Sequence, residues 1–176
     1  VDGPAPDTVN PSLWRHAQVL SRAGLFRVSD RIWQVRGFDL ANVTFVKGDK
    51  GWIVIDPLTV TEVARAAFDL VKKHVADKPV LAIIYTHSHT DHFAGAPGIV
   101  DPADVASGKV QVIAPKGFVD EVVSEWMIAG TAMGRRAFYQ FGYFLPRGPK
   151  GHSGMGMGTA LPARQPGRRP ACAQRL

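Results

Sequence analysis

Four side chains with metal-binding chemistry lie within six consecutive positions of this 176-residue chain. They are His87, His89, Asp91 and His92, in the order His-Ser-His-Thr-Asp-His. Imidazole and carboxylate groups together suit zinc, and also iron or manganese. Two such ions about 3.5–4 Å apart can share a water molecule and lower its pKa, which makes hydroxide available near neutral pH. The pattern therefore predicts a hydrolytic metal site, in which Asp91 also helps to position the attacking water.

The spacing of the four residues predicts how they divide. Alternate residues of an extended segment point the same way, so His87, His89 and Asp91 share one side and His92 does not unless the chain turns. We expect a turn, because the small residues 94–98 follow at once. Such a turn would place His87 and His89 on one ion and Asp91 and His92 on another. An ordinary polar loop and a metal site without catalysis are the alternatives.

The motif follows a predicted buried strand, and ligand sites of α/β sheets gather beyond the carboxyl ends of strands. Apolar runs at 52–56 and 80–86 predict two strands covered on both faces. Between them, apolar residues at helical spacing predict a helix over 60–75, which Thr59 and Glu62 would cap as a capping box. The other expected elements are strands at 31–37, 42–48 and 110–114, and helices at 13–23, 116–128 and 133–144.

Composition divides the chain into three parts. Residues 1–24 are a mostly irregular lead, and residues 25–150 form the folded body. Residues 151–176 are rich in Gly, Pro and Arg and contain no Asp, Glu or Lys, so we expect them to be disordered. Four arginines of this tail supply most of the formal net charge of +6. Because the body is nearly balanced, we expect no nucleic-acid partner.

Two further features bear on location. No apolar run approaches the ~18 residues of a membrane span, and Cys172 is the single cysteine, which excludes an internal disulfide. The first residues carry no basic and apolar leader pattern, so we expect a signal peptide to be absent or already removed. The compartment is unassigned: periplasmic, secreted and cytoplasmic locations all stay open.

The motif His-x-His-x-Asp-His resembles the signature of the metallo-β-lactamase superfamily. Within that superfamily, about residues 5–150 resemble the metal-dependent alkyl sulfatases, which include the enzymes that degrade sodium dodecyl sulfate. The strings that carry this narrower resemblance are APDTVNPSLWR, VRGFDLANVTFVKGDKGWIVIDPLT, IIYTHSHTDHFAG and AGTAMGRRAFYQFG.

This resemblance implies an α/β fold of the αββα sandwich type and hydrolysis of alkyl sulfate esters to alcohol and sulfate. It implies a site for two Zn²⁺ ions, with His87 and His89 on one and Asp91 and His92 on the other. Asp56, at the end of its strand, matches an acid that supports the metal ligands through hydrogen bonds. Full-length family members are homodimers, so the resemblance also implies self-association of the complete protein.

The chain also departs from the family pattern. Family members are several times longer and carry further ligands downstream, then a dimerisation region and a lipid-carrier-like domain. Asp120, Glu121 and Glu125 do not match those ligand positions. We therefore interpret residues 25–150 as the first half of the sandwich. The tail is consistent with a truncated or frame-shifted gene copy, and we expect an exposed apolar face, fewer bound ions and little turnover.

Several functional readings stay open. Other hydrolases of the same fold act on thioesters, lactones or β-lactams, and a non-catalytic metal-binding remnant is a third class. Arg135 and Arg136 either attract a sulfate group or form a solvated helix face. Aromatic residues of segment 138–144 either line a channel for an alkyl chain or make core contacts.

Overall fold

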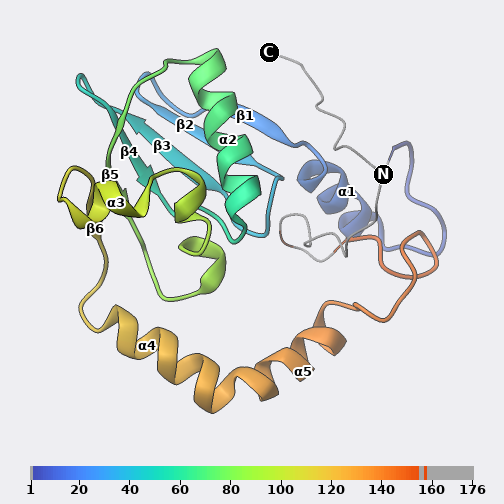
Figure 1. The fold of residues 1–176 in the computed structure, drawn as a ribbon. Coiled ribbons are helices and arrows are strands. Elements are labelled where there is room, and N and C mark those ends of the chain that lie inside the picture. The colour runs from blue at the N-terminus through green and yellow to red at the C-terminus, as the bar shows by residue number, and fades with distance from the viewer. Residues whose placement is uncertain (1, 155–156, 158–176) are drawn as a thin grey trace.

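A single six-stranded sheet organises the computed structural model, which describes residues 2–154 and residue 157. The strands follow one another in space as they do in the sequence, and β1 to β4 are antiparallel (Figure 1). β5 and β6 then run parallel to β4, which requires crossover connections. This confirms the α/β class. The strands are β1 (Gly24–Arg27), β2 (Ile32–Arg36), β3 (Val43–Lys47), β4 (Trp52–Ile55), β5 (Val80–Ile84) and β6 (Gln111–Ile113).

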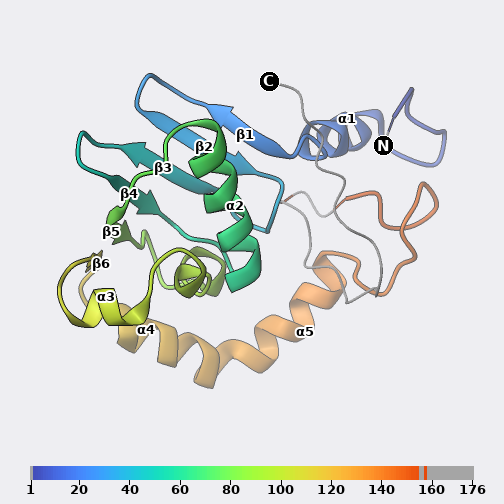
Figure 2. The ribbon, with the colours of Figure 1, turned by 45° about the horizontal axis from the view of Figure 1, so that its top comes forward.

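Helices flank the sheet and continue beyond it. Helix α2 supplies the crossover between β4 and β5, and it lies across one face of the sheet in both views (Figures 1 and 2). Two short 3₁₀ turns, η1 (Thr90–His92) and η2 (Ala96–Gly98), follow β5. The helices are α1 (Pro11–Leu20), α2 (Thr61–His74), α3 (Pro102–Ala106), α4 (Phe118–Ser124), the π-helical turn η3 (Glu125–Ala129) and α5 (Gly130–Gln140).

The core lies between the sheet and α2. Phe45, Val54 and Ile83 are neighbours across three strands in the register of the sheet, and all three are fully buried. Phe68 of α2 stacks on Phe45 with ring centroids 5.9 Å apart. Each such side chain contributes about 1.5–3 kcal/mol by leaving water. This layer fixes the relative positions of β4 and β5, whose carboxyl ends carry the candidate site.

The face opposite α2 is only partly covered. Ile53 and Ile55 are half-buried, Leu81 is 39% exposed and Ile113 is 47% exposed. The prediction that both apolar runs are covered on both faces was therefore wrong, because α2 covers one side and no second sheet is present among the described residues. The expected exposed apolar face is present.

The predicted capping box at α2 was also wrong. The helix begins after Val60, which makes no side-chain cap, and Thr59 turns its hydroxyl to Asp39 instead. The carboxylate of Asp39 accepts hydrogen bonds from the backbone N–H groups of Thr59 and Val60, at 3.0 and 3.3 Å. A buried acid from a distant loop thus takes the place of a local cap.

The two helices predicted at 116–128 and 133–144 form one run, α4–η3–α5, here called the helical arm (residues 118–140). The arm leaves the sheet after β6 and stands apart from it in both views (Figures 1 and 2). Its middle is exposed, with Met127 at 81% and Ile128 at 83%. The short helix α3 was not predicted.

The lead and the tail differ in how far the structure describes them. The lead contains the expected short helix, α1, whose Asn10 side chain caps the N–H of Ser12. Most of the predicted disordered tail, with Cys172, lies outside the described residues. Within the described residues, every helix is too short or too polar to cross a bilayer.

Candidate metal centre

The four predicted ligands lie on the loop that leaves β5, here called the histidine loop (residues 86–95). Asp56 directly follows the neighbouring parallel strand β4, and its N–H donates to the carbonyl of Ile84 at 3.0 Å. The carboxyl ends of two parallel strands therefore bring Asp56 and the histidine loop to one edge of the sheet, as predicted from the order of the elements.

Two glycines allow the histidine loop to pack tightly on the start of α2. The N–H of Gly95 donates to the carbonyl of Leu58 at 2.8 Å. A Cβ atom at Gly95 would overlap the carbonyl of Pro57 and lie 2.9 Å from Cβ of Ala64, and one at Gly98 would overlap the carbonyl of Thr61. Only a residue without a side chain fits these positions, so backbone contacts fix where the loop runs.

Asp56 holds the start of the histidine loop from a strained backbone conformation. Its φ is 54°, and that of Leu58, two residues on, is 66°. Residues in this left-handed region cost about 1–3 kcal/mol and persist where their surroundings hold them. Here the Asp56 carboxylate accepts from the Thr86 N–H at 2.9 Å and from the Thr86 hydroxyl at 2.7 Å.

Asp39 supports this segment from the other side, and the sequence analysis missed it. It is 1% exposed, and besides its bonds to Thr59 and Val60 it accepts from the Leu40 N–H at 2.7 Å. Its partners on the α2 segment lie 20 and 21 positions away, so no local pattern could reveal it. No sequence signal pointed to it, because Thr59 and Glu62 already match a capping box at α2.

The three histidine rings of the motif lie close together. The ring centroids of His87 and His92 are 4.0 Å apart, and those of His87 and His89 are 4.6 Å apart. The 3₁₀ turn η1 provides the predicted bend between His89 and His92. His92 Nε2 lies 3.4 Å from Oδ2 of Asp91, and its Nδ1 lies 2.9 Å from Oδ2 of Asp56.

Hydrogen bonding selects one tautomer of His87. The Thr86 hydroxyl donates its only proton to Asp56, so it must accept at the 2.9 Å contact with His87 Nδ1. His87 then carries its proton on Nδ1 and leaves the lone pair of Nε2 free for a cation. Burial lowers the pKa of His87, and the neighbouring His92 and His89 lower it further against the opposing charges of Asp56 and Asp91. Both effects favour the neutral ring that a metal needs.

The donor set fits a metal in type and proximity, although the donor atoms do not converge on one point. Nδ1 of His92 is buried and has no aligned hydrogen-bond partner. Within the described part of the chain, no group of three or more His, Cys, Asp or Glu side chains is arranged to hold an ion. The assignment of ions to ligands, and the supporting role of Asp56, therefore stay predictions.

An additional carboxylate reaches the cluster from the helical arm. Oε1 of Glu125 lies 3.2 Å from Nε2 of His89, and the Glu125 side chain is only 21% exposed. Glu125 matches no ligand position of the alkyl sulfatase family, so its sequence position alone does not mark it as a site residue. The contact could not be read from the sequence, since it depends on how the arm packs beside the loop.

The remaining residues that the sequence offered for substrate binding make none of the contacts described for the histidine cluster. Arg135 and Arg136 are exposed on α5. The aromatic residues that follow pack on one another, with Phe138 and Phe144 centroids 5.0 Å apart, yet Tyr139 is 80% and Phe144 is 72% exposed. None of them belongs to the core cluster of the described residues, and their role as a channel for an alkyl chain stays a prediction.

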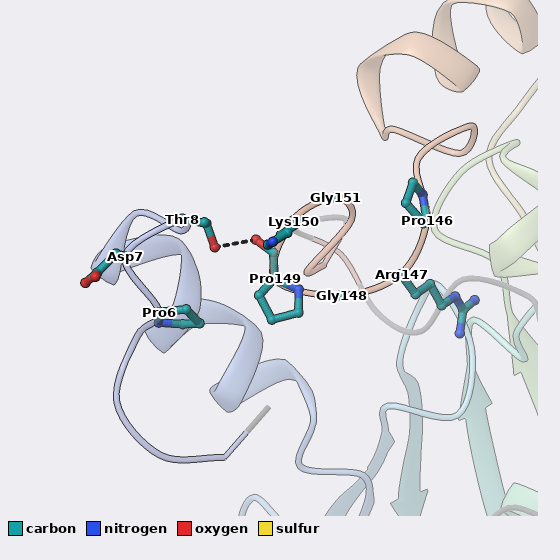
Figure 3. A pocket seen from close by; sticks show the side chains of 9 residues that line it. All are labelled: Pro6, Asp7, Thr8, Pro146, Arg147, Gly148, Pro149, Lys150 and Gly151. Atoms are coloured by element: carbon teal, nitrogen blue, oxygen red, sulfur yellow. Dashed lines mark hydrogen bonds between the residues drawn. The ribbon is translucent and has the colours of Figure 1, made fainter.

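A separate hollow lies between the lead and the segment after α5. It has a volume of about 500 Å³ and is lined by residues 6–8 and 146–151 (Figure 3). The Thr8 hydroxyl donates to the carbonyl of Pro149 at 2.8 Å and joins the two segments (Figure 3). None of its lining residues belongs to the histidine loop, so this hollow is not the candidate metal centre.

Known proteins are similar to this chain in sequence and in fold. A linear primary-alkylsulfatase from Pseudomonas sp. is 54% identical over 159 residues, which are 90% of this chain and 24% of that protein. The alkyl/aryl-sulfatase BDS1 of Saccharomyces cerevisiae is 51% identical over 154 residues, 88% of this chain and 24% of that protein. The solved structure of the stereoselective inverting sec-alkylsulfatase Pisa1 from Pseudomonas sp. matches with a TM-score of 0.80 at 54% identity, covering 88% of this chain and 24% of that one.

The chain therefore spans about a quarter of the length of these relatives. The sequence profile of the metallo-β-lactamase superfamily matches residues 36–171, which include β3, β4, β5 and the whole histidine loop. This match covers well over half of the chain, and the chain belongs to the metallo-β-lactamase superfamily.

Proposed function

We propose that the chain is part of a metal-dependent hydrolase of the alkyl sulfatase type, which converts an alkyl sulfate ester to an alcohol and sulfate. The observation that carries this proposal is the 54% identity to a linear primary-alkylsulfatase over 90% of the chain. In that role His87, His89, Asp91 and His92 are the amino-terminal ligands, and Zn²⁺ is the proposed metal because it favours imidazole and carboxylate donors.

The residues of the chain have distinct tasks in this proposal. When bound, zinc supplies a Lewis acid and an activated water at neutral pH. Thr86 keeps the proton of His87 on Nδ1 and so leaves Nε2 free to bind the metal, while Asp56 accepts from Thr86 and lies 2.9 Å from Nδ1 of His92. Asp91 carries a negative charge that, together with the imidazoles, favours a divalent cation. Its carboxylate also orients water by accepting a hydrogen bond from it.

A chimera tests the substrate class. The Pseudomonas linear primary-alkylsulfatase would receive this chain's residues 5–150 in place of its own matching segment. Dodecyl sulfate, a thioester, a lactone and a β-lactam would then be offered as substrates. We expect zinc-dependent sulfate release that His92→Ala abolishes. A folded, zinc-loaded chimera that hydrolyses one of the other substrates and not the sulfate ester would contradict the proposal.

A non-catalytic metal-binding role is the second candidate. It rests only on the proximity of the His87, His89 and His92 rings, and it requires no substrate-binding residues. Zinc retention by the isolated chain together with an inactive chimera would select this role over hydrolysis.

A further inference from the structure

Each histidine of the cluster has one ring nitrogen within 3.2 Å of an oxygen outside the proposed ligand set. For His87 the partner is the hydroxyl of Thr86, and for His92 it is the carboxylate of Asp56. For His89 it is the carboxylate of Glu125, 3.2 Å from Nε2. Metal-binding histidines commonly direct their second nitrogen to such an acceptor, which fixes the tautomer and the ring orientation.

Glu125 reaches His89 because the first residue of the helical arm docks beside the histidine loop. Phe118 stacks on Tyr85 with centroids 5.4 Å apart and meets Phe93 edge-on at 5.2 Å. Tyr85 precedes the loop's ligands and Phe93 follows them, so one ring contacts both flanks of the motif. The start of α4 is thereby fixed, and Glu125 follows about two helical turns later.

The π-helical turn η3 begins at Glu125. Turns of this kind shift the helical register and recur at functional sites. Within it the side chain of Glu125 is largely covered, whereas Trp126, Met127 and Ile128 are exposed. The arm therefore turns a carboxylate, and not its apolar residues, toward the histidine cluster.

We infer that Glu125 is a positioning residue, which accepts the Nε2 proton of His89 and leaves Nδ1 of that ring as the metal donor. This inference rests on the proposed metal-dependent function for its purpose, but the contact itself is a property of the metal-free chain. It assigns the helical arm a role in arranging the centre that none of the arm's sequence features indicated.

Nuclear magnetic resonance of the metal-free chain with ¹⁵N-labelled histidine tests the contact directly. At a pH well above the ordinary pKa of imidazole, we expect His89 to carry its proton on Nε2. Glu125→Met keeps the length of the side chain but removes the acceptor, so the tautomers of His89 should become mixed. Glu125→Gln restores an oxygen and should recover most of the original spectrum. Glu121→Met, an exposed position on α4, is the matched control and should leave His89 unchanged.

A zinc titration against a chromogenic chelator supplies the second readout. Loss of such a partner costs about 10–100-fold in metal affinity, so we expect that loss in Glu125→Met and a smaller one in Glu125→Gln. An unaltered His89 spectrum in Glu125→Met would overturn the inference, even if affinity fell. Should Glu125→Met not fold, Glu125→Ala removes the same acceptor, and an unaltered His89 spectrum in that variant would again overturn the inference. If the His89 spectrum changes in Glu125→Met but the chain takes up no zinc, the contact is upheld and the proposed function is refuted.

Discussion

The histidine loop and the helical arm are neighbours, yet they are held in opposite ways. The loop is fixed through its own backbone: the Gly95 N–H donates to the Leu58 carbonyl, and the Thr86 N–H donates to the carboxylate of Asp56, which follows the adjoining strand β4. The arm makes its contacts through a few side chains near its start, and its far end is largely exposed. The difference teaches that the sheet sets where the backbone places the proposed ligands. The arm contacts only one of their side chains, His89.

The largest expected difference lies between two phenylalanines. Phe45 is fully buried against Phe68 and Trp52, whereas Phe144, after the arm, is 72% exposed. Phe45→Ala should lower the free energy of unfolding by about 3–5 kcal/mol because it leaves a cavity. Phe144→Ala should change it by less than about 0.5 kcal/mol. Urea unfolding followed by circular dichroism measures both, and similar losses would show that the segment after the arm is as well packed as the sheet.

Asp39 should rank next. Asp39→Ala leaves the N–H groups of Thr59 and Val60 without acceptors inside the protein, at a cost of about 3 kcal/mol. Asp30→Ala, which removes an exposed ion pair to Arg27, should cost no more than about 1 kcal/mol. The same unfolding experiment compares them. Equal effects would mean that Asp39 does not brace the segment before α2.

Replacing a glycine by alanine should change the free energy of unfolding in opposite directions in the histidine loop and in the helical arm. Gly95→Ala forces a methyl group against Pro57 and Ala64, and should cost about 1–3 kcal/mol and weaken zinc binding. Gly134 lies in α5 with open space around it. Gly134→Ala should therefore stabilise the chain by about 0.5–1 kcal/mol through its higher helix propensity. A destabilising Gly134→Ala, or a silent Gly95→Ala, would reverse the assignment of rigid and loose regions.

The smallest expected effect is the pH dependence of arm docking. Burial raises the pKa of Tyr85, which stacks on the first residue of the arm. Folding thus favours the protonated phenol. The contribution of Tyr85 to the free energy of unfolding is therefore present below the ordinary pKa of about 10, and it is lost as the pH rises through the higher pKa of the folded chain. Tyr85→Phe should flatten the fall in unfolding free energy above about pH 10, the ordinary pKa of the phenol. An unchanged alkaline slope in that variant would contradict this.

The sequence predicted those parts of the molecule that depend on local patterns. The strands β2 to β5 and helix α2 are present where the spacing of apolar residues indicated them. The turn within the histidine motif is present where the small residues that follow indicated it. The resemblance to the metallo-β-lactamase superfamily is confirmed by the match over residues 36–171. These features share a cause, because each is determined by residues close together in the chain.

The features that the sequence did not predict depend on distant contacts. Asp39 replaces the capping box because it folds back over 20 positions onto Thr59. Glu125 meets His89 only because Phe118 docks between Tyr85 and Phe93. The half-covered sheet has the same origin: the apolar runs encode strands, but what packs on each face is decided by the rest of the fold.

Zinc content after exhaustive dialysis tests the central claim most directly. The purified chain and a variant with His87, His89 and His92 all changed to Ala would be loaded with zinc, dialysed and analysed by mass spectrometry. The account predicts that the chain retains zinc and that the variant loses it while keeping its circular dichroism spectrum. Equal zinc contents in two folded proteins would show that the histidine cluster is not a metal centre.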